Sequence, residues 1–209
     1  IIQSNRMKKN HIDIISMGCS KNLIDSEKII KRLDAKGYSV SHNPEFPDGE
    51  YVLVNTCGFI ADAKQESIDI LLQLTDLKRK KKIGKIVAMG CLTQRYLGEL
   101  KEELPEIDYL YGKFDWNAFI DNLPDLKTPK NYKLWERSLT TPPFSTYLKI
   151  SEGCNRFCAF CAIPLITGRH TSRPIEEILE ETELLVSQGV KEFNIIAQDL
   201  SSYGMDMYG

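Results

Sequence analysis

Short apolar runs alternate with stretches of helical periodicity along the first half of the chain. The runs predict strands at 12–17, 38–41, 51–54, 86–89 and 108–111. Between and after them, apolar residues at helical spacing predict helices at 23–36, 61–77, 94–104 and 116–123. Strands separated by helices are typical of a parallel sheet with right-handed crossovers. The pattern therefore predicts an α/β fold, with a parallel-sheet domain over residues 7–123.

A second alternation follows a proline-rich segment. Residues 124–143 read as a linker, because they place four prolines among polar residues: Pro124, Pro129, Pro142 and Pro143. Beyond the linker, a strand at 146–150, a helix at 175–187 and a strand at 192–197 begin a new β/α pattern. One β/α/β unit cannot cover both faces of its own sheet. Residues 144–209 are therefore predicted to form the first part of a second, incomplete domain.

Composition is that of an ordinary globular chain. The 209 residues are 42% hydrophobic and 27% charged, which is enough to build a core. A net charge of −2 gives no global field that would attract nucleic acid or an acidic membrane. No apolar stretch approaches the roughly 20 residues that span a bilayer, and no secretory signal follows Met7. We expect a cytoplasmic protein with no membrane partner, in which residues 1–6 precede a native start at Met7.

The six cysteines carry the strongest chemical signal. Six could form three disulfides, but a chain of this size in a reducing compartment seldom needs them. Cys154, Cys158 and Cys161 lie within one short loop, and three thiolates so spaced can hold three irons of a cubane cluster while the fourth iron stays open. Structural zinc is the alternative, although it favours paired ligands in a tetrahedral set and His170 is the nearest imidazole.

The other three cysteines each follow a predicted strand and adjoin a glycine: Cys19 with Gly18, Cys57 with Gly58, and Cys91 with Gly90. Neighbouring strands lie about 5 Å apart, and the carboxyl edge of an open α/β sheet is where sites form. We therefore expect the three thiols to meet at one point. The alternative is three separate half-buried thiols, since free cysteine is often buried.

The residues around these cysteines resemble a known family. The spacing at 154–161, the aromatic Phe160 and the preceding strand are similar to the radical S-adenosylmethionine superfamily. The segments 17–27, 55–60 and 90–92 resemble the N-terminal domain of the methylthiotransferases, which join that domain to a radical S-adenosylmethionine partial barrel. The resemblance covers nearly all of 7–209.

The resemblance implies cofactors and their contacts. It implies two 4Fe-4S clusters and S-adenosyl-L-methionine, with one cluster on Cys19, Cys57 and Cys91 and the other on Cys154, Cys158 and Cys161. It also nominates Phe160, Gln198 and Asp199 as contacts to S-adenosylmethionine, although Gln198 could equally be a strand-end residue that caps backbone groups. A radical cofactor suits a C–H bond that has no acidic proton.

Two branches of this family differ in substrate. One modifies an isopentenylated adenosine in tRNA, and the other modifies an aspartate of ribosomal protein S twelve, in the small subunit, at its β-carbon. The segments 57–60, 65–67, 197–200 and 203–204 resemble the second branch. The resemblance thus implies an enzyme, a sulfur-transferring methylthiotransferase that also needs an electron donor. The tRNA enzyme, or a non-enzymatic iron–sulfur carrier, is the alternative.

Several weaker signals remain open. The cationic run 78–82 with Lys85 is a solvated helix end or a contact for ribosomal RNA. Arg173 faces a carboxylate or serves the entry of a helix. The scattered histidines at 11, 42 and 170 indicate no catalytic base, and Trp116 and Trp135 indicate packing.

Overall fold

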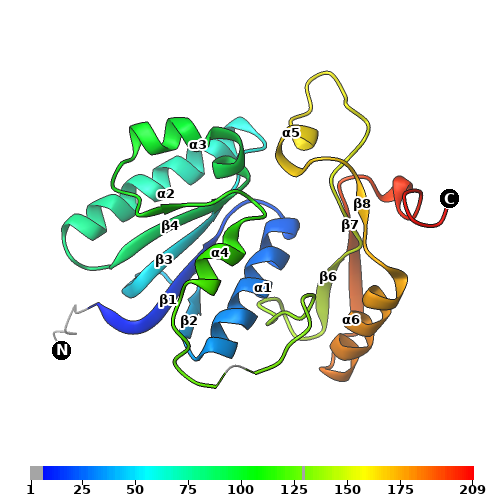
Figure 1. Ribbon diagram of the computed structural model, residues 1–209, viewed down its shortest axis with the longest axis horizontal. Helices are drawn as coiled ribbons and strands as arrows, with labels where there is room; N and C mark the ends of the chain where they lie inside the picture. The colour runs from blue at the N-terminus through cyan, green and yellow to red at the C-terminus, as the bar shows by residue number, and fades with distance from the viewer. Residues whose placement is uncertain (1–6, 129) are drawn as a thin grey trace.

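The computed structural model describes residues 7–128 and 130–209 (Figure 1). Residues 1–6 and Pro129 of the predicted linker lie outside the described residues. Figure 1 shows a large layered β/α module joined to a smaller one, with helix α1 (Ser20–Lys36) on the side of the large module that faces the small one. None of the helices in these ranges is long and apolar enough to cross a membrane.

The large module is built on a five-stranded parallel sheet, which confirms the predicted fold class. Its order is β2-β1-β3-β4-β5. The strands are β1 (Lys8–Ser16), β2 (Ser39–His42), β3 (Gly49–Thr56), β4 (Lys85–Gly90) and β5 (Tyr109–Leu110). Ile14 of β1 pairs with Leu53 of β3, and Val54 of β3 pairs with Ala88 of β4. The ends of β1, β3 and β4 are therefore neighbours.

Helices cover both faces of this sheet. Successive side chains of a strand point to opposite faces, so Ile14 and Leu53 contribute to one buried cluster while Val52 and Val54 contribute to another. Residues of α1 and α4 (Trp116–Asp121) belong to the first cluster, and residues of α2 (Ala61–Arg79) and α3 (Cys91–Glu103) belong to the second. Coverage on both faces explains why the strands are almost continuously apolar.

Two helices begin earlier than the sequence pattern predicts. Helix α1 begins at Ser20 with Cys19 as its N-cap, and α3 begins at Cys91 itself. The chain turns sharply just before each start, at Gly18 (φ +80°) and Gly90 (φ +105°), where only glycine adopts such angles without strain. Apolar periodicity misses the start of α1 because Ser20, Lys21 and Asn22 are polar. It misses the start of α3 because Leu92 is the one buried hydrophobic residue in that turn.

The connection between the two modules is packed and not freely extended. Trp135 and Arg137 are both buried there. The Arg137 guanidinium donates to Glu27 of α1, to Glu181 of helix α6 (Ile175–Ser187) at 2.8 Å, and to the carbonyl oxygen of Tyr147. The proline-rich segment therefore fixes one module against the other.

The small module contains the predicted β/α/β unit. Strand β6 (Ser145–Lys149) pairs in parallel with β9 (Glu192–Ile196), and α6 lies between them in sequence. A short antiparallel pair, β7 (Ser151–Glu152) with β8 (Thr171–Ser172), leads into and out of the cysteine loop. Helix α5 (Ile163–Thr167) follows that loop, and the 3-10 helix η1 (Leu200–Ser202) follows β9. Leu179, Val186 and Ile195 are exposed on this module.

Candidate functional site

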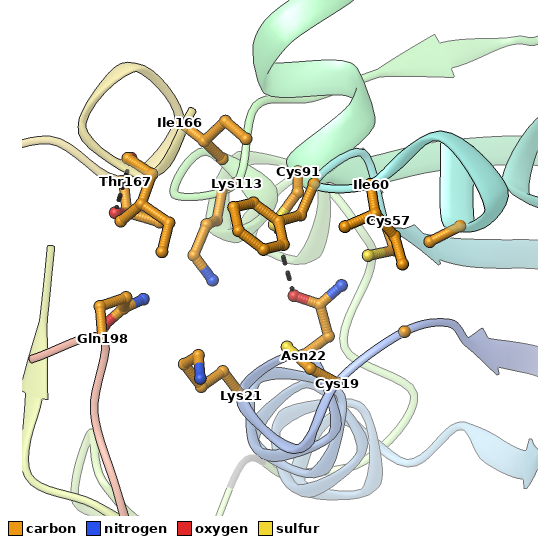
Figure 2. Close-up of a pocket in the computed structure, with 14 residues that line it drawn as sticks. Cys19, Lys21, Asn22, Cys57, Ile60, Cys91, Lys113, Ile166, Thr167 and Gln198 are labelled. Carbon is orange, nitrogen blue, oxygen red and sulfur yellow. Dashed lines mark hydrogen bonds between the residues drawn. The ribbon is translucent and has the colours of Figure 1, made fainter. Parts of the chain in front are cut away.

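Three strand ends bring three cysteines to one cavity. Cys57 comes directly after β3, Cys91 directly after β4, and Cys19 in the turn after β1. All three line a cavity of about 400 Å³, which Figure 2 shows in close-up. Helix α5 and Gln198 of the small module form its other side. Cys19 and Cys91, which are 72 positions apart in sequence, thus line one cavity. Residues of both modules line this cavity.

Glycines allow the close approach of these strand ends. A Cβ atom on Gly18 would lie 2.6 Å from both Cβ and Sγ of Cys57. A Cβ on Gly90 would lie 2.6 Å from the carbonyl oxygen of Thr56 and from Asn55 Oδ1. Atoms cannot pack that closely, so any larger side chain at either position would push the thiol-bearing turns apart.

Buried amides and a hydroxyl hold the turns in place. Asn22 Nδ2 donates to the carbonyl oxygens of Met17 (3.2 Å) and Thr56 (3.0 Å), which ties the β1 turn to the end of β3. Asn55 Nδ2 donates to the carbonyl oxygen of Asn22 at 2.8 Å. Ser67 Oγ accepts from the Cys57 amide and donates to the Cys57 carbonyl. Sequence reasoning assigned no role to Asn22, Asn55 and Ser67, although all three lie in the segments that carry the family resemblance.

The thiols are spaced for a group larger than a single ion. Zn–S bonds of about 2.3 Å place the sulfurs of a tetrahedral zinc site about 3.8 Å apart. Within the described part of the chain, the only histidine, cysteine and carboxylate groups whose ligand atoms all lie within 4.8 Å of one another are His11, Asp13 and Asp48, so neither cysteine triplet is that tight. This spacing disfavours mononuclear zinc in either triplet.

The electrostatics of the cavity depend on burial. Burial raises the pKa of the Cys91 thiol to about 12, and the neighbouring Cys57 and Cys19 add to that effect. The protonated thiol lies 3.6 Å from Asn22 Oδ1, its hydrogen-bond acceptor (dashed in Figure 2). A metal that binds here must displace a proton, so its affinity will rise with pH.

The second cysteine triplet lies on one loop between β7 and α5. Cys154 is buried, Cys161 is half-buried and Cys158 is exposed. Local backbone contacts shape this loop: the Cys154 amide donates to the Gly168 carbonyl at 3.2 Å, and the Cys161 amide donates to the Cys158 carbonyl at 3.0 Å. Phe157 adopts a left-handed φ of +46°, which curls the chain between the first two cysteines.

The three predicted cofactor contacts differ in their surroundings. Phe160 is fully exposed and does not line the cysteine cavity. Gln198 lines it, donates to Glu152, and keeps a buried Oε1 without a partner in the described structure. Asp199 caps η1, and hydrogen bonds from Ser201, Arg156 and Ser202 hold the pKa of its carboxyl well below the usual range. The carboxylate of Asp199 is therefore held by contacts within the protein. The side-chain oxygen of Gln198 has no hydrogen-bond donor among the described residues.

A buried ion network joins the two modules beside the cavity. Lys113 Nζ lies 2.7 Å from Asp25 Oδ2, Lys149 Nζ lies 2.6 Å from Asp25 Oδ1, and Lys149 also pairs with Glu152 at 2.9 Å. Burial alone would lower the pKa of Lys113, but Asp25 and Glu152 raise it above its ordinary value. Glu152 stands two residues before Cys154, so the network connects the surroundings of both triplets. Sequence analysis gave no signal for it, because its members come from separate elements.

The weaker sequence signals lie elsewhere or have partners. Arg173 donates to Glu181 at 2.7 Å, so of its two predicted roles the carboxylate contact is present. In the cationic run, Lys78 pairs with Asp108 at 2.7 Å and Arg79 with Glu106 at 3.0 Å. None of the three histidines lines the cysteine cavity, and Trp116 and Trp135 are buried, as expected for packing.

An open parallel sheet with three thiols at its carboxyl edge, joined to a Cys-x3-Cys-x2-Cys loop, defines an iron–sulfur protein of the radical SAM class. Comparison with family models agrees. Residues 11–112 match the model described as Uncharacterized protein family UPF0004, and residues 148–206 match the Radical SAM superfamily. That superfamily implies an iron–sulfur cluster and S-adenosylmethionine.

Similar curated proteins share one name. The chain is 56% identical over 202 residues to the ribosomal protein uS12 methylthiotransferase RimO of Phocaeicola vulgatus. It is 54% identical over 202 residues to RimO of Bacteroides thetaiotaomicron and 50% identical over 206 residues to RimO of Porphyromonas gingivalis. Each alignment covers 97% of this chain and 46% of the relative, so the chain spans about half the length of the curated relatives it matches. Over that span the chain belongs to the radical SAM methylthiotransferase family.

Proposed function

We propose that the protein containing this chain transfers a methylthio group to the β-carbon of an aspartate in ribosomal protein uS12. The names of relatives 50–56% identical over 97% of the chain support this substrate. One structural observation carries the proposal: three thiols from adjacent strands share a cavity with Gln198 and α5 of the radical SAM module. A site that spans both modules can present one substrate atom to two reactive centres.

The six cysteines suit two clusters. Cys19, Cys57 and Cys91 would hold one, and the loop cysteines Cys154, Cys158 and Cys161 would hold the other. A 4Fe-4S cluster with S-adenosylmethionine supplies the one-electron chemistry that removes a hydrogen atom from an unactivated C–H bond.

The remaining lining residues would serve the cofactor and the reaction. The partnerless Oε1 of Gln198 is available to accept a hydrogen bond from the ammonium group of S-adenosylmethionine. Phe59, Ile60 and Ile163 line the cavity and would exclude water from reactive species. Phe160 and Asp199 remain predicted cofactor contacts.

The domain division and the partners are part of the same proposal. The two modules share no sheet, which supports residues 7–123 as the methylthiotransferase domain, 124–143 as the linker and 144–209 as the start of the radical SAM domain. A ribosomal-protein substrate implies a cytoplasmic enzyme that meets an electron donor there. Contact with ribosomal RNA would involve the exposed part of the cationic run, such as Lys81 and Lys82.

The test uses the full-length gene product, reconstituted with iron and sulfide in the absence of oxygen. It should release 5′-deoxyadenosine and add one methylthio group to uS12, detected by mass spectrometry of the aspartate-containing peptide. If the enzyme modifies tRNA and not uS12, then tRNA is its substrate and the proposed substrate is wrong. Bound iron without release of 5′-deoxyadenosine would indicate an electron carrier. Bound zinc without sulfide would refute the cluster assignment. Cys158→Ala serves as the inactive control.

A further inference from the structure

Two lysines line the cysteine cavity, and they differ in how their charge is balanced. The side chain of Lys113 is 3% exposed, and its ammonium lies 2.7 Å from Asp25 and 3.9 Å from Glu152. Lys21 lines the same cavity and is half-buried, and none of the ion pairs within the described ranges includes it. Figure 2 shows both side chains beside the open space that Gln198 closes from the opposite side.

The nearest candidate counter-ion for Lys21 is already occupied. Asp25 lies one helical turn further along α1, at the spacing where a lysine and an aspartate can pair. Its two oxygens instead contact Lys113 Nζ at 2.7 Å and Lys149 Nζ at 2.6 Å. Asp25 is therefore already paired through both oxygens, and neither of them contacts Lys21 in the described structure.

The position of Lys21 is unfavourable for the helix itself. It is the second residue of α1, whose first turn contains no acidic residue. A cation in the first turn opposes the helix macrodipole, so the charge of Lys21 does not stabilise the helix.

We propose that Lys21 recognises the side-chain carboxylate of the substrate aspartate and so determines specificity for an acidic residue. This inference rests on the proposed function, because it takes a uS12 aspartate as the group that enters the cavity. Lys21 lines the same cavity as the three thiols, so a carboxylate bound to its ammonium would hold the adjacent β-carbon inside that cavity.

The cavity favours a side-chain carboxylate over a backbone phosphate of RNA. Besides its lysines, its lining is largely apolar: Phe59, Ile60, Ala63, Ile163 and Ile166. At about 400 Å³ it has the size of a small-ligand site and not of an open groove that tracks a phosphate chain.

The test measures peptide binding to the cluster-loaded full-length enzyme without S-adenosylmethionine, so that turnover plays no part. A uS12 peptide with its target aspartate is compared with the same peptide carrying asparagine, by fluorescence anisotropy. The wild type should prefer the aspartate peptide about tenfold or more, as expected for a charge-assisted hydrogen bond. Lys21→Met should reduce the preference to within about twofold, Lys21→Arg should retain part of it, and the exposed-site control Lys101→Met should leave it unchanged.

Three results would overturn the inference, and they are distinguishable. If Lys21→Met keeps the full preference but lowers iron content or shifts the cluster's reduction potential, the lysine balances the charge of the cluster and does not recognise substrate. If the wild type binds both peptides equally, the cavity does not recognise the carboxylate, although uS12 can still be the substrate. If the wild type binds neither peptide while it modifies tRNA, the proposed substrate itself is wrong. Iron and sulfide content, measured for every variant, separates loss of the cluster from loss of recognition.

Discussion

Each cysteine triplet groups three thiols, but one triplet lies on a single loop and the other on the ends of three strands. Cys154, Cys158 and Cys161 lie on one loop, whose shape comes from backbone hydrogen bonds within and beside it. Cys19, Cys57 and Cys91 lie far apart in sequence and meet only because β1, β3 and β4 are neighbours in the sheet. The first arrangement requires local structure, and the second requires the whole large module to fold.

This difference also assigns different supporting residues to each triplet. The turns that carry Cys19 and Cys57 need Gly18 for their close approach and Asn22 to join them. The loop triplet lies within one segment of the chain, and its Cys154 amide is held by the nearby Gly168 carbonyl. Changes far from the thiols should therefore affect the first triplet more than the second.

The largest expected effect is on bound iron. In the full-length protein, Cys57→Ala and Cys158→Ala should each lower iron from about eight to about four per chain, and the double variant should hold almost none, as expected for two separate cubanes. Colorimetric iron and sulfide assays on anaerobically reconstituted protein measure this. An unchanged iron content in Cys57→Ala would show that the strand-end thiols hold no cluster.

The next largest effect is on the docking of the modules. Arg137→Met should lower the free energy of unfolding by about 3–5 kcal/mol, because it leaves Glu27 buried without a counter-ion and leaves Glu181 paired with Arg173 alone. Lys133→Met, which removes the exposed ion pair with Glu180, is the matched control and should cost about 0–1 kcal/mol. Urea unfolding monitored by circular dichroism gives both values. Equal, small losses would mean that the connection does not fix the modules.

A smaller effect should separate steric contact from backbone strain. Gly18 and Gly189 both have left-handed φ angles, of +80° and +103°, but only a Cβ on Gly18 would contact another residue, Cys57. Gly189→Ala should cost about 1 kcal/mol of stability and leave iron content unchanged. Gly18→Ala should cost about 2–3 kcal/mol and also lower the iron bound by the first triplet. If the two variants retain the same iron, the close approach of the turns is not needed for the first triplet.

The smallest effect concerns the helix that carries Cys19. Burial lowers the pKa of Lys28 on α1 to about 8, with nearby Lys149 adding to the shift. The unfolded chain holds that proton up to about pH 10.5, so Lys28 should make the fold more stable as pH rises from about 8 to 10.5. Lys28→Met should remove this contribution to the slope and make the fold more stable at pH 7. Urea unfolding of both proteins at pH 7, 8, 9 and 10 measures the difference, and parallel curves would contradict it.

Much of the fold followed from the sequence because the signals are local. Apolar runs and helical periodicity predicted the strands and helices of the large module, with starts that differ by three or four residues at β1, α1 and α3. The starts of α1 and α3 were missed because Ser20 and Cys91 follow glycine turns and carry no apolar stripe. Prolines predicted a linker and Trp135 was expected to pack, but the burial of Arg137 was not predicted, since it has no local signature.

Prediction of the site met the same limit, because contacts between separate elements leave no local signal in the sequence. That three strand-end thiols share the carboxyl edge of a parallel sheet was predictable. The strand order that makes β1, β3 and β4 neighbours was not, and neither was the network of Asp25, Lys113, Lys149 and Glu152. Each of these residues has its partner on another element, so no window of sequence contains both.

The sequence by itself determined the alternation of strands and helices and the spacing of the loop cysteines, because backbone periodicity and a short loop depend on neighbouring residues. Only the tertiary structure decided that Cys19, Cys57 and Cys91 share a cavity with Gln198. It also decided that Lys21 lines this cavity and forms no ion pair with any residue that the structure describes. Those facts depend on which elements pack together, and packing is set by the burial of the whole core.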